Sequence, residues 1–259
     1  MNFAAGGQYV AGKSDAHTVE QRRQGAARDF HGLFINLDSR PDRLSRIQQE
    51  FARYGLTDRY TRLRAISDPR PYLGCYRSHL KAIEEAQRIG GVVHILEDDS
   101  ILSAELAPFL VSNELEQLLE RYDIVHLDMW VDQNETSLRA YKAAAATGLF
   151  ELGTQPGARV GAASSYVVAP RSLGKIKRLW RYYLDAKRAI DDVCGRLAAA
   201  GEIKVAVVLP FLTSVDIDNG SISDVQSRLS RNRQKTLIEV RAQFFVQNIR
   251  AEGRPEPAA

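Results

Sequence analysis

Apolar and polar residues follow one another along the chain in two spacings, one typical of buried strands and the other typical of helices. Short apolar runs predict strands at 33–37, 60–66, 92–96, 123–130, 165–169 and 203–209. Apolar residues that recur every three or four positions predict helices at 41–54, 74–89, 104–121, from 170 onwards and at 228–250. The segment 131–160 has no clear period, and its glycines and proline indicate a loop-rich region.

Strands that alternate with helices predict an α/β fold, with a mostly parallel sheet flanked by helices on both faces. We expect a single domain at 31–228, after a flexible leader at 1–30 and before a C-terminal helix and loose tail at 229–259. In such sheets ligands bind beyond the carboxyl ends of the strands. The polar residues that follow the strands are therefore the candidates for chemistry.

Composition and charge narrow the classes of function. The chain has 259 residues and a formal net charge of +3, and this basic excess is too small for a typical nucleic-acid binder. No apolar run reaches the roughly 18 residues that a bilayer span requires, so we expect a cytoplasmic protein. The cysteines, Cys75 and Cys194, show neither a CxxC nor a zinc-site spacing, and we expect both to be reduced.

The last predicted helix, 228–250, carries many arginines among its apolar residues. A basic amphipathic helix of this kind can lie on an anionic membrane surface, which would give the protein a peripheral contact with the inner face of a membrane. The alternative is a helix that packs on the domain and leaves its basic face in solvent.

Three consecutive carboxylates, Glu97, Asp98 and Asp99, end the apolar strand at 92–96. Their mutual repulsion is unfavourable unless a cation or a basic side chain lies nearby. Hard divalent cations prefer carboxylate oxygens, bridge readily to phosphates and stabilise a departing diphosphate as Lewis acids. The alternative is a solvated acidic turn that caps the next helix.

Two other segments carry candidate ligand-binding residues. Ser78 and His79 belong to a Cys-x-x-Ser-His sequence in the first turn of a predicted helix, where free N–H groups favour anions. Asn36 opens the segment NLDSRPDR after the first strand, and Arg40 and Arg43 in it are planar donors suited to a diphosphate. A core histidine and exposed helical arginines are the alternatives for these residues.

These blocks, in this order and spacing, resemble glycosyltransferase family 25. The resemblance rests on INL followed by Arg43, on the Cys-x-x-Ser-His sequence and on LEDD at 96–99. Later segments are similar as well: 165–168 with Arg171, 189–191, and 207–210 with a serine-containing stretch at 221–224. The family includes bacterial lipopolysaccharide galactosyltransferases and collagen-modifying transferases, and the resemblance covers roughly 31–228.

The resemblance implies a GT-A-like fold, a UDP-sugar donor and Mn²⁺, or else Mg²⁺, as the cofactor. It implies transfer of a hexose, galactose or glucose, to a glycan or lipid-linked glycan acceptor with inversion, in lipopolysaccharide or cell-surface glycan biosynthesis. By the same resemblance, Glu97 and Asp99 hold the metal, and the donor site is formed by Asn36, Arg40, Arg43, Ser78, His79 and Asp98.

Two roles remain open within the resemblance. Asp191 matches the family aspartate and is the candidate base that deprotonates the acceptor hydroxyl, with Asp192 as a competitor and a helix N-cap as the alternative. No histidine follows His126, so a late metal ligand has to be an aspartate, and Asp218 is the candidate beside Asp216.

Other functions could use the same acidic edge. One is a metal-dependent nucleotidyltransferase or nucleotide-sugar hydrolase, although the chain lacks the GxxxxGK[ST] phosphate loop. The other is a non-catalytic homologue that binds a nucleotide sugar without turning it over. Such a homologue is favoured only by the missing late histidine.

Overall fold

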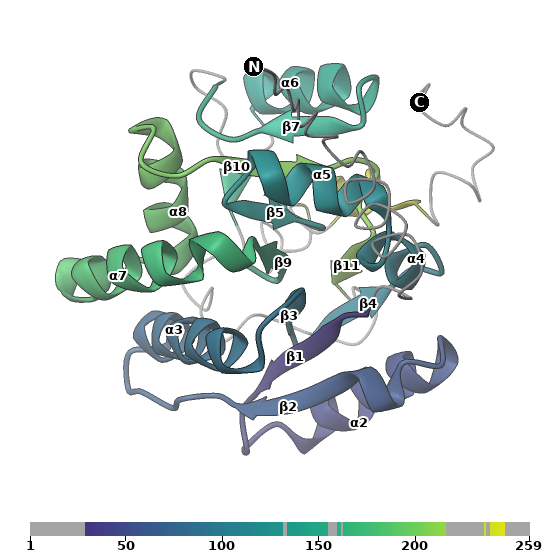
Figure 1. Cartoon of the computed structure of the whole chain (residues 1–259), viewed down its shortest axis with the longest axis vertical. Helices are drawn as coiled ribbons and strands as arrows, with labels where there is room; N and C mark the ends of the chain where they lie inside the picture. Colours follow the sequence, from purple (N-terminus) through teal and green to yellow (C-terminus); the bar gives the residue numbers. More distant parts are fainter. Residues whose placement is uncertain are drawn as a thin grey trace, which may run out of the picture.

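The computed structural model describes residues 29–131, 134–154, 160–161, 163–215, 236 and 239–246 (Figure 1). The helices are α2 (Pro41–Arg53), α3 (Pro71–Ile89), α4 (Leu106–Leu110), α5 (Asn113–Arg121), α6 (Glu135–Ala145), α7 (Leu173–Tyr183) and α8 (Ile190–Ala199). The 3-10 turns are η1 (Thr57–Arg59), η2 (Pro170–Ser172) and η3 (Leu184–Ala186). The strands are β1 (His31–Asn36), β2 (Tyr60–Arg64), β3 (Val93–Glu97), β4 (Ser100–Leu102), β5 (Ile124–His126), β6 (Trp130–Val131), β7 (Leu149–Glu151), β8 (Val160–Gly161), β9 (Ser165–Val168), β10 (Val205–Val208) and β11 (Thr213–Val215).

Seven strands form the central sheet in the order β2-β1-β3-β9-β5-β10-β7. Strands β2, β1 and β3 run parallel to one another, as do β5 and β10. The inserted strand β9 is antiparallel to both of its neighbours, and the edge strand β7 is antiparallel to β10. Because two antiparallel steps restore the direction, β3 and β5 point the same way. The predicted α/β fold with a mostly parallel sheet flanked by helices is confirmed.

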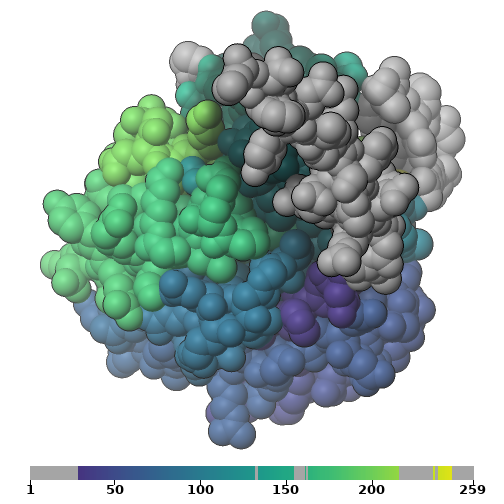
Figure 2. Space-filling view, viewed as in Figure 1, coloured from purple at the N-terminus to yellow at the C-terminus, as the bar shows by residue number. Residues whose placement is uncertain are grey.

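The two faces of the sheet carry separate cores. One face packs against α3, α7 and α8, whose apolar side chains include Tyr76, Ile83 and Trp180. The other face packs against α2, α4 and α5, with Ile47 and Phe51 among its buried residues. Figure 1 shows α3, α7 and α8 together on the left of the view and α4 on the right, and Figure 2 shows the green surface of α7 next to the blue surface of the α3 part of the chain.

Side chains alternate between these two layers along β3, as the pleat of a strand requires. Val93 and Ile95 point to the α3 layer, whereas Leu96 points to the α2 layer. By the same alternation, Glu97 belongs to the α3 side and Asp98 to the α2 side. This parity decides which helix supplies the partner of each acidic side chain.

Two segments differ from their predicted structure. The predicted helix at 104–121 is divided into α4 and α5, because the Ser112 hydroxyl accepts a hydrogen bond of 3.1 Å from the Leu115 amide and starts a new helix. The segment expected to be loop-rich contains α6, which Asn134 caps by accepting a 2.8 Å hydrogen bond from the Ser137 amide. Both caps are local signals that follow the ordinary N-cap preference.

The described residues near the C-terminus pack on the domain. Val240 and Phe244 are buried in the α3-side core, and the Phe211 amide donates a 2.7 Å hydrogen bond to the Phe244 carbonyl. These are the contacts of a segment packed on the domain, and the rest of the predicted helix at 228–250 lies outside the described residues. Cys75 and Cys194 are free thiols. No described helix is long and apolar enough to cross a membrane.

Two buried histidines should make the fold sensitive to acid. Burial lowers the pKa of His94 and of His126 to about 3, whereas a histidine in an unfolded chain titrates near about 6.5. The unfolded state therefore binds more protons across this window, so the stabilisation is present above about pH 6.5 and is lost as the pH falls, by up to about 1.4 kcal/mol per pH unit for each histidine.

Replacing His126 should remove part of this acid sensitivity. Both of its ring nitrogens are buried without a hydrogen-bond partner, so His126→Leu removes a titrating group and breaks no hydrogen bond. We expect a smaller drop in Tm between about pH 7 and about pH 5 than in the unmodified protein. The exposed His31→Gln is the control, and an equal acid-induced drop in the Leu variant and the unmodified protein would contradict the assignment.

Candidate functional site

A cavity of about 380 Å³ opens at the carboxyl ends of β1 and β3. Helices α2 and α3 begin beside it, each with a proline in its first turn, where the missing N–H costs nothing. Its lining includes seven residues predicted from the sequence: Arg40, Arg43, Ser78, His79, Glu97, Asp98 and Asp99. The three motifs that are separate along the chain therefore share one cavity, in the position that open α/β sheets offer to ligands.

Arg43 lies between two of the acidic side chains. Its Nη1 is 3.1 Å from Asp98 Oδ1 and 3.2 Å from Asp99 Oδ2, and all three side chains are less than a tenth exposed. Asn36, from the end of β1, donates a 2.6 Å hydrogen bond to Asp98 Oδ2. Both oxygens of Asp98 are thus engaged, and the repulsion within the triplet is offset by a cation that belongs to the chain itself.

The protonation of these groups follows from burial and neighbouring charge. Burial raises the pKa of Asp98 although Arg43 lowers it, and burial with the charges of Glu97 and Asp98 raises the pKa of Asp99 to about 6 although Arg43 lowers it. Burial lowers the pKa of Arg43, but the charges of Asp99 and Asp98 outweigh it and leave that pKa raised. Asp99 Oδ1 is buried and has no hydrogen-bond partner among the described residues, so it is an acceptor that a cation would satisfy.

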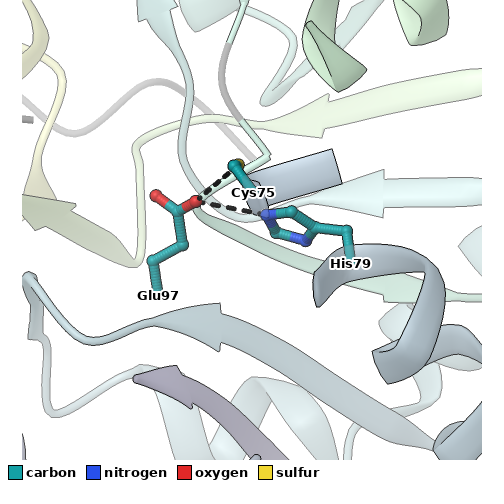
Figure 3. A group of neighbouring side chains, drawn as sticks. All are labelled: Cys75, His79 and Glu97. Carbon is teal, nitrogen blue, oxygen red and sulfur yellow. Dashed lines mark hydrogen bonds and ion pairs between the residues drawn. The ribbon is translucent and has the colours of Figure 1, made fainter. Parts of the chain in front are cut away.

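Glu97 turns to the opposite side, toward α3 (Figure 3). Its Oε1 is 3.1 Å from His79 Nε2 and accepts a 3.6 Å hydrogen bond from Cys75 Sγ. On the far side of the ring, His79 Nδ1 is 3.0 Å from the Tyr166 hydroxyl. Burial raises the pKa of Glu97, but the hydrogen bond with His79 and the charge of Arg43 outweigh it and keep that pKa below its ordinary value.

Ser78 and Arg40 line the same cavity but already have partners. The Ser78 hydroxyl donates a 2.7 Å hydrogen bond to the Gly74 carbonyl and accepts one of 2.7 Å from the Ile66 amide. It therefore joins α3 to the segment that follows β2. Arg40 forms a 2.8 Å ion pair with Asp42 at the surface, and its carbonyl accepts a hydrogen bond from Asn36.

The structure places the other predicted residues less directly. Asp191 lies in the first turn of α8, where its Oδ1 accepts a 2.9 Å hydrogen bond from the Asp192 amide. It does not line the cavity, yet its charge helps to raise the pKa of Cys75, which does. Asp192 is paired with Arg188 and Arg196 on the surface. Asp218 and Asp216 lie outside the described residues.

Sequence reasoning did not single out a second buried ion pair beside the acidic triplet. Asp128, two residues beyond β5, receives hydrogen bonds from Arg241 on both oxygens, and Arg241 also donates a 2.6 Å hydrogen bond to the Ser164 hydroxyl. Burial lowers the pKa of Arg241 to about 10, although the charges of Asp99 and Glu97 raise it. An acid after a buried strand, in IVHLDMW, was the available signal, but its partner is 113 residues away.

Comparisons with known proteins complete this description. Neither a family model nor a curated protein sequence matches the chain. Partial likenesses in fold are found to the glycosyltransferase GlyE of Streptococcus pneumoniae TIGR4 (7% identity, TM-score 0.43, 90% of this chain and 66% of GlyE) and to the galactosyltransferase LgtC, solved with donor and acceptor sugar analogues (11%, 0.41, 86% and 99%). A third is a mannose-1-phosphate geranyltransferase of Thermus thermophilus (14%, 0.31, 70% and 73%). The chain thus spans just under two thirds of GlyE, and at these TM-scores the chemistry has to be argued from its own residues.

Removing the cation between Asp98 and Asp99 should destabilise the protein strongly. Arg43→Met leaves two buried carboxylates without their partner, and breaking a buried pair in this way costs about 3–5 kcal/mol. Urea denaturation measures the change in the free energy of unfolding. Arg88→Met removes an arginine paired with Glu85 on the exposed face of α3 and should change stability by less than about 1 kcal/mol. Equal losses in the two variants would contradict the role given to Arg43.

Proposed function

We propose that this chain is a metal-assisted glycosyltransferase that moves a hexose, galactose or glucose, from a UDP-sugar to a glycan or glycolipid hydroxyl. The proposal is carried by one observation: Arg43, His79 and the acidic residues 97–99 line the same cavity at the carboxyl edge of the sheet. A nucleotide-sugar donor brings a diphosphate, which needs positive charge around it and stabilisation as it leaves. The cavity offers both a buried arginine and a set of carboxylates.

The acidic residues divide the work in this proposal. Asp98 holds Arg43, which with Arg40 faces the diphosphate as a planar donor. Asp99 and Glu97 would hold Mn²⁺ or Mg²⁺, since Asp99 Oδ1 is a buried acceptor without a hydrogen bond and oxygen ligands suit such ions. The bound ion would supply Lewis-acid stabilisation of the leaving UDP. Asp218 is the proposed third ligand.

The acceptor side of the proposal depends on Asp191. Inversion requires a base that takes the proton of the acceptor hydroxyl while the diphosphate leaves on the opposite face of the sugar. Asp191 lies close enough to the cavity for its charge to act on Cys75, and α8 presents it at the start of a helix. An acceptor would then approach along the α8 side of the cavity.

Membership of glycosyltransferase family 25, a place in lipopolysaccharide or cell-surface glycan biosynthesis and a cytoplasmic location belong to the same proposal. They are supported by the order of the Arg43, Cys-x-x-Ser-His and LEDD blocks. A peripheral contact with an anionic membrane would suit a lipid-linked acceptor. Vesicle co-sedimentation of the full chain tests that contact.

Asp99→Asn should weaken metal-dependent donor binding. The amide keeps the shape of the side chain and removes the charge, so we expect Mn²⁺-dependent UDP affinity to fall by at least about tenfold, which is about 1.4 kcal/mol. Isothermal calorimetry with and without Mn²⁺ measures it, and Asp58→Asn in η1 is the exposed control. Unchanged affinity would favour a non-catalytic protein or another metal position, and release of pyrophosphate instead of UDP on turnover would favour a nucleotidyltransferase.

Asp191→Asn should separate the chemical step from donor binding. A lost general base slows transfer by about 10²–10⁴-fold, while UDP affinity stays near that of the unmodified protein. The assay follows UDP release with a hexose acceptor present. Asp192→Asn is the matched control on the next residue, and if it causes the larger loss the base has to be reassigned.

A further inference from the structure

We propose that Cys75, His79 and Glu97 form a binding site for a borderline-soft divalent cation of the Zn²⁺ class. One ligand atom from each of these residues lies within 4.8 Å of the other two. Figure 3 shows the three side chains converging, with the Glu97 carboxylate facing both the thiol and the ring. The inference rests on this geometry and does not depend on the proposed glycosyl transfer.

The backbone explains why the three side chains meet. Cys75 and His79 are four residues apart in α3, so they lie one above the other on the same helix face. Glu97 ends β3 with the parity that directs it to the α3 layer. Two rigid elements therefore hold the ligands, and a metal requires little movement of the chain to bind.

The distances are close to those that a tetrahedral ion needs. Metal–ligand bonds of about 2.0–2.3 Å place neighbouring ligand atoms about 3.3–3.8 Å apart. Glu97 Oε1 is 3.1 Å from His79 Nε2 and 3.6 Å from Cys75 Sγ. Small rotations of the side chains would bring all three atoms onto one ion.

A partner behind the histidine is already in place. Metal-bound histidines almost always donate their other ring N–H to an oxygen, which fixes the tautomer and the ring plane. His79 Nδ1 is 3.0 Å from the hydroxyl of Tyr166, which is 1% exposed. This contact leaves Nε2 as the nitrogen that faces Glu97 and the thiol.

The set of donor atoms selects the kind of ion. A sulfur, an imidazole nitrogen and a carboxylate oxygen suit Zn²⁺ or Co²⁺, whereas Mn²⁺ and Mg²⁺ prefer oxygen ligands. On binding, the Cys75 S–H bond breaks, a sulfur–metal bond forms and the proton passes to solvent. Without a cation the thiol keeps its proton, because burial and the charge of Glu97 raise the pKa of Cys75 well above its usual value.

Three protein ligands leave one tetrahedral position open, as in catalytic rather than structural zinc sites. All three ligand residues line the cavity, so the open position faces it. A water molecule or a phosphate oxygen of a bound ligand would complete the coordination. The site is thus separate in its donors from the oxygen position at Asp99, although Glu97 borders both.

Cobalt titration of the full chain under reducing, anaerobic conditions tests the proposal, because Co²⁺ replaces Zn²⁺ and reports thiolate ligation by a charge-transfer band in the near ultraviolet. We expect the band to rise to one equivalent of Co²⁺ and to be bleached by Zn²⁺ but not by an equal concentration of Mn²⁺. Absence of the band in the unmodified protein, or its bleaching by Mn²⁺, would overturn the proposal.

Matched variants identify the ligands. The chain contains only two cysteines, so Cys75→Ser should abolish the band, whereas Cys194→Ala should retain it at full intensity. Glu97→Gln should weaken cobalt binding by at least about tenfold, and circular dichroism confirms that each variant is folded. A full-intensity band in Cys75→Ser would reject the site.

Failure of this proposal and failure of the proposed function give different results. If the site is wrong but the function is right, the cobalt band is missing while Mn²⁺-dependent UDP binding remains. If the function is wrong but the site is right, the thiolate band forms and no UDP-sugar binds.

Discussion

A buried arginine neutralises the acidic end of the central strand, and the architecture of the site depends on this interaction. Three carboxylates in succession at the end of β3 would repel one another in a region from which water is largely excluded. Arg43 contacts Asp98 and Asp99 at 3.1 and 3.2 Å, and Asn36 completes the shell of Asp98. Because Arg43 comes from α2 and Asn36 from β1, the same contacts fix the first βα unit against the third strand of the sheet.

The pleat of β3 then gives the acidic residues different environments. Asp98 faces the α2 layer and is fully occupied by the chain, whereas Glu97 faces the α3 layer and contacts His79 and Cys75. Asp99 keeps one buried oxygen without a hydrogen bond. An acidic triplet that looks uniform in sequence is therefore three distinct groups in space, and only two of them retain capacity for a ligand.

A second charge pair closes the region from the other side. Asp128 and Arg241 are buried together with Ser164, and the charges of Glu97 and Asp99 act on Arg241. Two arginines from opposite ends of the domain thus balance the acids near the cavity. This balance couples the C-terminal segment to the site, since Arg241 lies among residues 239–246 that pack on the core.

The sequence by itself determined the alternating elements, the position of the acidic triplet at a strand end and its neighbourhood to Arg43, Ser78 and His79. Those features follow from local periodicity and from the rule that the carboxyl ends of parallel strands share one edge. Only the tertiary structure decided that β9 enters the sheet antiparallel, that Glu97 and Asp98 take partners from different helices, and that Asp128 pairs with Arg241. Strand direction and long-range ion pairs depend on which segments meet in space, and local spacing carries no information about partners that are 113 residues apart.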